Sequence, residues 1–262
     1  MKQRIITAVL GIIVVVPIIL YGRIPFTIVT YILASIALFE LLRMNKTVVR
    51  YFIPQLSAYL FLWLYMFPVA QYELFQVSIS KRELVSLLLI VLLSCIVVTK
   101  NKFTLKEASF ILLATIFLVT AFEYLLYTRH TGLSYFLLVL FVIWATDSGA
   151  YFIGRTFGRR KLWPEISPNK TIAGAFGGIL LACLVGIIFY FTNTVQFSFI
   201  QLILLCIFMS VIGQLGDLVA SAMKRTYDIK DFGKLFPGHG GVLDRLDSVL
   251  FTFLVLSLIV VF

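Results

Sequence analysis

The sequence predicts an all-α, polytopic integral membrane protein that forms one membrane domain over residues 1–262, with about nine spanning helices and the N-terminus inside. Hydrophobic residues make up 61% of the chain. Charged residues make up only 13%, against about 25% in a soluble domain. The apolar residues form long runs, and most Lys and Arg residues lie between them. So much apolar surface can be buried only in lipid, or in a helix bundle within lipid.

Nine runs approach the roughly 20 apolar residues that a spanning helix needs. In chain order they are Ile5–Tyr21, Ile24–Leu42, Phe52–Ala70, Leu84–Thr99, Ala108–Tyr127, Ser134–Ala145, Ile172–Thr192, Phe199–Leu218 and Leu246–Phe262. The sixth run is short unless its helix continues into the polar region around Asp147, as a helix that lines a cavity does. The first run resembles a signal peptide, but no small-residue cleavage site follows it, so we interpret it as retained.

The distribution of basic residues predicts that the N-terminus lies in the cytoplasm, because cytoplasmic connections carry an excess of Lys and Arg. With nine spans threaded from that side, only four of the 22 basic residues fall outside, namely Arg23, Lys81, Arg82 and Arg129. Topology therefore explains the net charge of +10, and we expect no nucleic-acid partner. The acidic and basic loop before the last run also falls on the cytoplasmic side.

The two halves of the chain differ in their polar residues. Residues 1–130 carry few of them and are interpreted as scaffold and lipid-contact helices, whereas residues 131–262 carry the candidate chemistry. Glu40 and Glu123 lie within apolar runs, and we expect each to have a structural partner that the sequence does not identify. The three Cys residues lie far apart in apolar runs, so neither a zinc site nor a disulfide is expected.

The stretch from Ser210 to Ser248 is the most informative part of the sequence. Gln214, Asp217, Ser221 and Lys224 follow helical spacing and form one polar stripe. Asp244 and Asp247 are three residues apart and share a face of the next segment. Between these segments, the loop from Phe236 to Gly241 contains three Gly residues, which allow the backbone to approach a ligand closely.

Carboxylates beside hydrocarbon need a compensating charge, since an ionised acid at a helix centre costs about 2.5–3.5 kcal/mol. A divalent metal or a nearby cation is the usual compensation. Carboxylates for a metal, cations for phosphates and exposed backbone N–H groups together predict a site that handles phosphates.

A second polar group ends the sixth run, where Asp147 is flanked by hydroxyl side chains, including that of Ser148. The stretch Ser167-Pro-Asn-Lys170-Thr171 precedes a helix start, where free N–H groups favour an anion. Its spacing is not that of a P-loop. The glycines that follow, Gly174, Gly177 and Gly178, fit either close helix packing or close approach of a ligand, and the sequence leaves both open.

The C-terminal polar stretch resembles a known signature. Ser221-Ala-Met-Lys224-Arg225, Lys230-Asp231-Phe-Gly233 and Pro237-Gly-His239-Gly240-Gly241-Val-Leu-Asp244-Arg245-Leu-Asp247 closely resemble the signature of bacterial phosphatidate cytidylyltransferases, the CDP-diacylglycerol synthases. Many specified positions at fixed spacing make this resemblance more specific than a lone glycine motif. The wider resemblance begins at Asp147, and the N-terminal half matches only as a run of membrane helices.

The resemblance implies transfer of a cytidylyl group from CTP to phosphatidic acid, giving CDP-diacylglycerol and pyrophosphate. It implies a multi-pass protein of the bacterial inner (cytoplasmic) membrane with its active site facing the cytoplasm. The implied cofactor is Mg²⁺ held by Asp217 and Asp244, with a second cation such as K⁺ left open. The implied catalytic residues are Asp217, Asp244, Lys224, Arg225 and His239. The implied substrate-binding residues are Asp147, Ser148, Lys170, Thr171, Ser221, Lys230, Gly240, Gly241, Arg245 and Asp247.

Two other functions stay open at this point. A CTP-dependent polyprenol or other lipid kinase resembles the same family at a low level, although the full signature favours the cytidylyltransferase. A cation transporter would use Asp147, Asp217 and Asp244 as an ion path, but these acids cluster near the cytoplasmic face rather than at the membrane midplane. The oligomeric state is also open, with a homodimer as one option.

Overall fold

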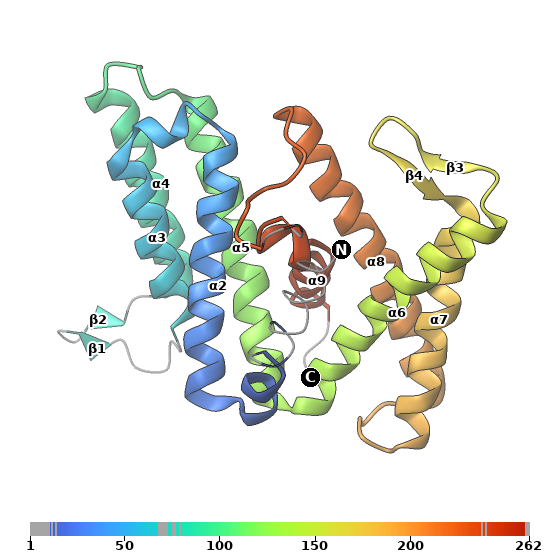
Figure 1. Ribbon diagram of the computed structural model, residues 1–262. Coiled ribbons are helices and arrows are strands. Elements are labelled where there is room, and N and C mark those ends of the chain that lie inside the picture. The colour runs from blue at the N-terminus through green and yellow to red at the C-terminus, as the bar shows by residue number, and fades with distance from the viewer. Residues whose placement is uncertain are drawn as a thin grey trace.

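The computed structural model describes residues 11, 13, 15–67, 73–74, 77–78, 80–236, 238 and 240–259. These residues are mostly helical, as predicted (Figure 1). The elements are α2 (Arg23–Met44), η1 (Val48–Arg50), α3 (Phe52–Met66), β1 (Glu73–Leu74), β2 (Val77–Ser78), α4 (Lys81–Val98), α5 (Leu105–Thr131), α6 (Leu133–Phe157), β3 (Lys161–Trp163), β4 (Ser167–Thr171), α7 (Ile172–Phe191), α8 (Phe199–Thr226) and α9 (Leu243–Leu256).

Five of the described helices, α2, α5, α6, α7 and α8, are long and apolar enough to cross a membrane. The chain is therefore a multi-pass membrane protein. The other four predicted spans correspond to the 15-residue α3, to α4 with its charged first turn, to the 14-residue α9, and to the first run, of which only part is described.

Local sequence explains where several helices begin. Helices α4, α5 and α8 each start at a capping box. The hydroxyl side chain of the capping residue accepts a backbone N–H of the first turn, and the side chain of a Glu or Gln three residues later accepts the backbone N–H of the capping residue. The capping residues are Ser80, Thr104 and Ser198. Thr171 caps α7, its Oγ1 accepting from the Gly174 N–H at 3.1 Å.

The helices form two groups with α9 between them (Figure 1). Helices α2 to α5 make one group, while α6, α7 and α8 make the other, with the β3–β4 hairpin at one end. Helix α9 packs against α5 on one side and α8 on the other. A carboxylate placed at the start of α9 therefore faces elements from both halves of the chain.

Helices α6 and α7 pack backbone to backbone through glycines. A Cβ at Gly149 would lie 2.5 Å from the Gly177 carbonyl oxygen, and one at Gly177 would lie 2.5 Å from the Cβ of Ile153. A Cβ at Gly174 would lie 2.7 Å from the carbonyl oxygen of Ala150. Of the two readings of these glycines, the structure supports close helix packing.

Gly177→Val is therefore expected to lower the midpoint of thermal unfolding in detergent. Overpacking of this kind costs about 1–3 kcal/mol, because the two backbones must separate to admit the side chain. The matched control is Gly11→Val, since a Cβ at Gly11 meets no described atom within 4 Å. Equal midpoints for the two variants would contradict this account of the α6–α7 contact.

Several helix boundaries differ from the sequence predictions, and three of the differences concern the polar segments. Helix α6 continues past Ala145 to Phe157, which confirms that the sixth run extends through the Asp147 region. Helix α8 runs on from Leu218 to Thr226, so its polar stripe lies on one continuous helix. Helix α9 begins at Leu243 rather than Leu246, because buried acceptors cap its first turn.

The all-α prediction also missed two short hairpins, β1–β2 and β3–β4. In the second, Lys161 pairs with Thr171 and Trp163 with Ser167. The stretch from Ser167 to Thr171 does precede a helix start, as predicted, but it is a strand that runs directly into α7. Strand β4 is short and contains Pro168, so its sequence gave no clear strand pattern.

Candidate active site

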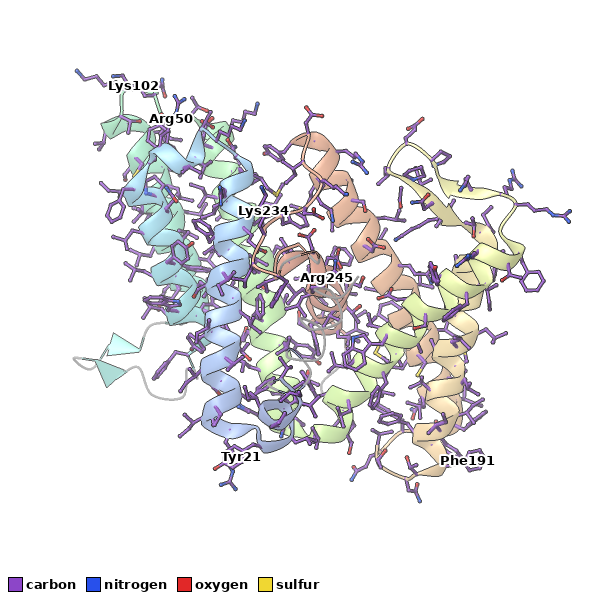
Figure 2. All side chains as sticks on the ribbon, in the orientation of Figure 1. Tyr21, Arg50, Lys102, Phe191, Lys234 and Arg245 are labelled. Carbon is purple, nitrogen blue, oxygen red and sulfur yellow. The ribbon has the colours of Figure 1, made fainter. Side chains whose placement is uncertain are left out.

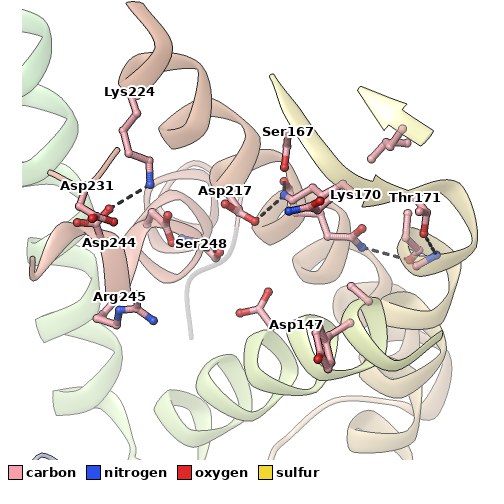
Figure 3. Close-up of a pocket in the computed structure, with 18 residues that line it drawn as sticks. Asp147, Ser167, Lys170, Thr171, Asp217, Lys224, Asp231, Asp244, Arg245 and Ser248 are labelled. Atoms are coloured by element: carbon pink, nitrogen blue, oxygen red, sulfur yellow. Dashed lines mark hydrogen bonds and ion pairs between the residues drawn. The ribbon is translucent and has the colours of Figure 1, made fainter. Parts of the chain in front are cut away.

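A polar cavity of about 460 Å³ opens between α6, β4, α7, α8 and the start of α9 (Figure 3). Its lining combines acids and cations from both polar groups of the sequence. The lining residues are Asp147, Ala150, Tyr151, Leu162, Ser167, Asn169, Lys170, Thr171, Gly174, Ala175, Gln214, Asp217, Lys224, Asp231, Asp244, Arg245, Asp247 and Ser248.

Asp217 and Lys170 join the two polar groups across the cavity. Asp217 lies on α8, and its Oδ2 is 2.6 Å from the Nζ of Lys170 on β4. The same Nζ donates to the Gln214 carbonyl oxygen at 3.2 Å. Strand β4 thus places a lysine over the polar stripe of α8, where it balances one carboxylate.

Both carboxylate oxygens of Asp244 accept hydrogen bonds. Its Oδ1 lies 3.0 Å from the Lys224 Nζ, and its Oδ2 accepts the backbone N–H groups of Phe232 at 2.8 Å and Gly241 at 3.0 Å. Its side chain is only 3% exposed. Asp244 therefore holds the connection between α8 and α9 in place and also fixes Lys224.

The carboxylates of Asp147 and Asp247 have fewer contacts that balance their negative charge. Asp147, on α6, has no hydrogen bond or ion pair within the part of the chain that the structure describes. Asp247 accepts the Ser248 N–H at 2.8 Å. Both lie close enough to Asp217 for the carboxylates to repel one another. Carboxylates from α6, α8 and α9 therefore lie near one another in the cavity, where a cation would be stabilised.

These acids suit Mg²⁺ shared with a ligand better than a cage of protein ligands alone. Across the described residues, no three His, Cys, Asp or Glu side chains gather closely enough to hold a metal. Mg²⁺ at nucleotide sites is usually held by one or two carboxylates together with substrate phosphates and water. Asp217, with Asp147 and Asp247 nearby, matches that donor set.

Glu40 is a part of the site's framework whose contacts the sequence did not reveal. It lies on α2, is 4% exposed, and accepts the N–H groups of Val242 at 3.0 Å and Leu243 at 2.9 Å. A carboxylate is stabilised there by the unpaired N–H groups at the start of a helix. A Cβ at Gly233 or Gly241 would overlap the Glu40 carboxylate, so the loop packs directly on it.

An acid inside an apolar run was the only signal for Glu40, because its partners are backbone groups about 200 positions away. The expectation of a structural partner is confirmed. It is also confirmed for Glu123, which pairs with Lys81.

Comparison with known proteins decides the family. A model described as "Cytidylyltransferase family" matches residues 2–262. The chain belongs to the cytidylyltransferase family. The "Phosphatidate cytidylyltransferase" of Bacillus subtilis (strain 168) is 48% identical to it over 255 residues, which cover 96% of this chain and 94% of that protein. Proteins with the same name from Staphylococcus epidermidis and Staphylococcus aureus (strain COL) are 41% and 40% identical over 262 residues, each covering 100% of this chain and 99% of its own.

The structure places the other signature residues of this cytidylyltransferase in different surroundings. Gly240 has a φ of +86°, and its carbonyl oxygen accepts the Phe236 N–H at 2.8 Å, which closes the loop. Arg245 lines the cavity opposite Asp147 (Figure 3). His239 lies outside the described residues.

Six predicted residues do not contribute to the cavity lining as the structure describes it, namely Ser148, Ser221, Arg225, Lys230, Gly240 and Gly241. Ser148 and Arg225 are exposed. Lys230 lines a neighbouring pocket of about 640 Å³ at the end of α2, together with Arg43, Lys46 and Lys234. Asp231 lines both pockets, so this basic pocket of the cytidylyltransferase adjoins the polar cavity.

Proposed function

We propose that this chain transfers the cytidylyl group of CTP to phosphatidic acid, giving CDP-diacylglycerol and pyrophosphate. The observation that carries the proposal is the single cavity in which Lys170, Lys224 and Arg245 lie among the carboxylates. Cations and metal-binding acids in one cavity suit two phosphate-bearing substrates. The named relatives, all phosphatidate cytidylyltransferases, support the same reaction.

The proposed reaction depends more on positioning the two substrates than on activating a nucleophile. A phosphate oxygen of phosphatidate attacks the α-phosphorus of CTP, the bond from that phosphorus to the β-phosphate bridging oxygen breaks, and pyrophosphate leaves. The attacking phosphate is already an anion, so an activated Ser or Cys is not required. The main barrier is repulsion between two anions, which Lys170 and Lys224 reduce by binding phosphate oxygens.

Mg²⁺ is the proposed cofactor, and when bound it neutralises triphosphate charge and stabilises the leaving pyrophosphate. Asp217 is the first proposed ligand, with Asp147 and Asp247 close by. Asp244 was predicted as the second ligand, but its Oδ1 already contacts Lys224 and its Oδ2 holds the loop. Ligation by Asp244 would therefore require Lys224 to turn toward a substrate phosphate. K⁺ as a second cation stays part of the proposal.

For the topology, we propose about nine spans with the N-terminus in the cytoplasm of a bacterial cell. Arg50 and Lys102 lie at one end of the molecule, and Tyr21 and Phe191 at the other (Figure 2). The excess of basic residues in the connections at the first end favours the cytoplasm for it. CTP would then enter past the basic pocket, and residues 131–262 would carry the chemistry while residues 1–130 support it.

Purified protein in detergent, supplied with phosphatidate, Mg²⁺ and CTP labelled at one phosphate, tests the reaction. Label at the α-phosphate is expected in the lipid product, and label at the γ-phosphate is expected in pyrophosphate. Transfer of the γ label to lipid would instead indicate a kinase. Absence of both transfers, together with cation flux in liposomes, would indicate a transporter.

A further inference from the structure

We propose that the phosphatidate substrate lies across Arg245, with its phosphate in the polar cavity and part of one acyl chain in an apolar groove on the other side of that residue. This inference rests on the proposed function and assigns a place to its lipid substrate. The occupant of the groove is an acyl chain, because the groove joins the polar cavity at a residue that suits a phosphate.

The groove lies among α2, α5, α6, α9 and the helical residues 15–19 that precede α2, and it measures about 130 Å³. Its walls include Leu33 of α2, Leu125 of α5, Leu140 of α6 and Val249 of α9. Nearly all of its lining is apolar, and Arg245 is the charged residue among the described lining residues. Pockets for drug-sized ligands are about 300–1,000 Å³, so this groove fits a segment of one chain rather than a whole lipid.

Two helices line both spaces, with polar residues in the cavity and apolar residues in the groove. On α6, Asp147 lines the cavity and Trp144, three residues earlier on the same helix face, lines the groove. On α9, Asp247 lines the cavity and Leu246 lines the groove. Arg245 lines both spaces, so it stands at the junction of an aqueous site and a hydrocarbon-like one.

A phosphatidate molecule likewise has a polar part that meets an apolar part. Its phosphate monoester joins a glycerol that carries acyl chains, so a charged end and an apolar end meet within a few bonds. Arginine binds phosphate oxygens in pairs, and its aliphatic stem packs against apolar surface. Arg245 therefore has the chemistry to hold the phosphate while the adjoining acyl segment enters the groove. The remaining chain length would extend into the bilayer.

Narrowing the groove tests the acyl assignment. Leu33→Trp is expected to raise the KM for dioleoyl phosphatidate about fivefold or more, while the KM for CTP and the kinetics with dihexanoyl phosphatidate stay within about twofold. The matched control is Ile32→Trp on the same helix, because Ile32 is 53% exposed and does not line the groove as described. Equal effects on long and short lipids, or equal effects of the two substitutions, would overturn the assignment.

Changing the arginine tests the phosphate contact. Arg245→Gln is expected to raise the KM for both lipids about tenfold or more, because the contact is charged and independent of chain length. Arg245→Lys should restore part of that loss, and the KM for CTP should change little. An equal rise in the KM for CTP would place Arg245 on the nucleotide instead.

A direct binding measurement separates this inference from the proposed reaction. Phosphatidate with a diazirine near the glycerol end of one chain should, after irradiation, label groove residues of α2, α5, α6 or α9 in the wild-type chain. Labelling only at the outer surface of α7 or α8 would overturn the inference, whatever the activity. Cytidylyl transfer without groove labelling would leave the proposed function standing and remove only the inference.

Discussion

Asp217→Asn is expected to reduce the rate of cytidylyl transfer about a hundredfold or more while the chain remains folded. Asparagine keeps the size of the side chain but removes the charge that balances Lys170 at 2.6 Å and that we propose binds Mg²⁺. Loss of one preorganised electrostatic contact to a transition state costs on the order of 100- to 1000-fold in turnover. Steady-state transfer of α-labelled CTP to phosphatidate, at several Mg²⁺ concentrations, measures the effect.

The matched control is Glu165→Gln, an exposed acid outside the cavity lining as described, which should leave turnover within about twofold. A ligand role also predicts that Asp217→Asn needs more Mg²⁺ for half-maximal activity, whereas a purely structural role does not. Wild-type activity in Asp217→Asn, with an unchanged Mg²⁺ requirement, would remove the metal assignment.

Glu40→Gln is expected to lower both thermal stability and turnover, although Glu40 lies on α2, outside the half of the chain proposed to carry the chemistry. The carboxylate accepts two buried backbone N–H groups, and the glutamine amide offers an acceptor to only one of them. Leaving a buried donor unsatisfied costs about 1–3 kcal/mol. The midpoint of thermal unfolding in detergent and the rate of transfer are the two measurements.

Glu123→Gln serves as the control for Glu40. Glu123 also lies on an apolar helix, but its partner is Lys81 and its side chain is 29% exposed, so water replaces part of the lost interaction. We expect a smaller fall in the unfolding midpoint and nearly unchanged transfer. If Glu40→Gln matched the wild type in both measurements, the role of Glu40 in fixing the start of α9 would be excluded.

The sequence predicted a multi-pass helical membrane protein, the polar stripe of Asp217 and Lys224 on one helix, and the shared face of Asp244 and Asp247 on the next. These predictions succeeded because apolar runs and helical spacing are local patterns. They did not extend to the partners of each acid. Nothing local indicated that Asp244 would be held by the Phe232 and Gly241 N–H groups.

Contacts between distant segments explain the remaining differences. Strand β4 depends on pairing with β3 across a short turn, and its pattern is too brief to identify as a strand. Glu40 contacts the start of α9, which lies about 200 positions later in the sequence. The sequence around either segment therefore does not identify the other as its partner. Helix α9 begins earlier than predicted for the same reason, because a side chain of α2 caps its first turn.

The glycine contact between α6 and α7 constrains how the enzyme can admit its substrates. The glycines bring the two backbones into direct contact, with the Ile153 and Leu181 side chains packed beside them, so we expect the two helices to move together as one wall. We therefore expect Asp147 on one helix and Thr171 at the start of the other to keep a nearly constant separation during catalysis. Any widening needed for a lipid to enter or a product to leave must come from the opposite wall, where α8 and α9 are joined by a loop.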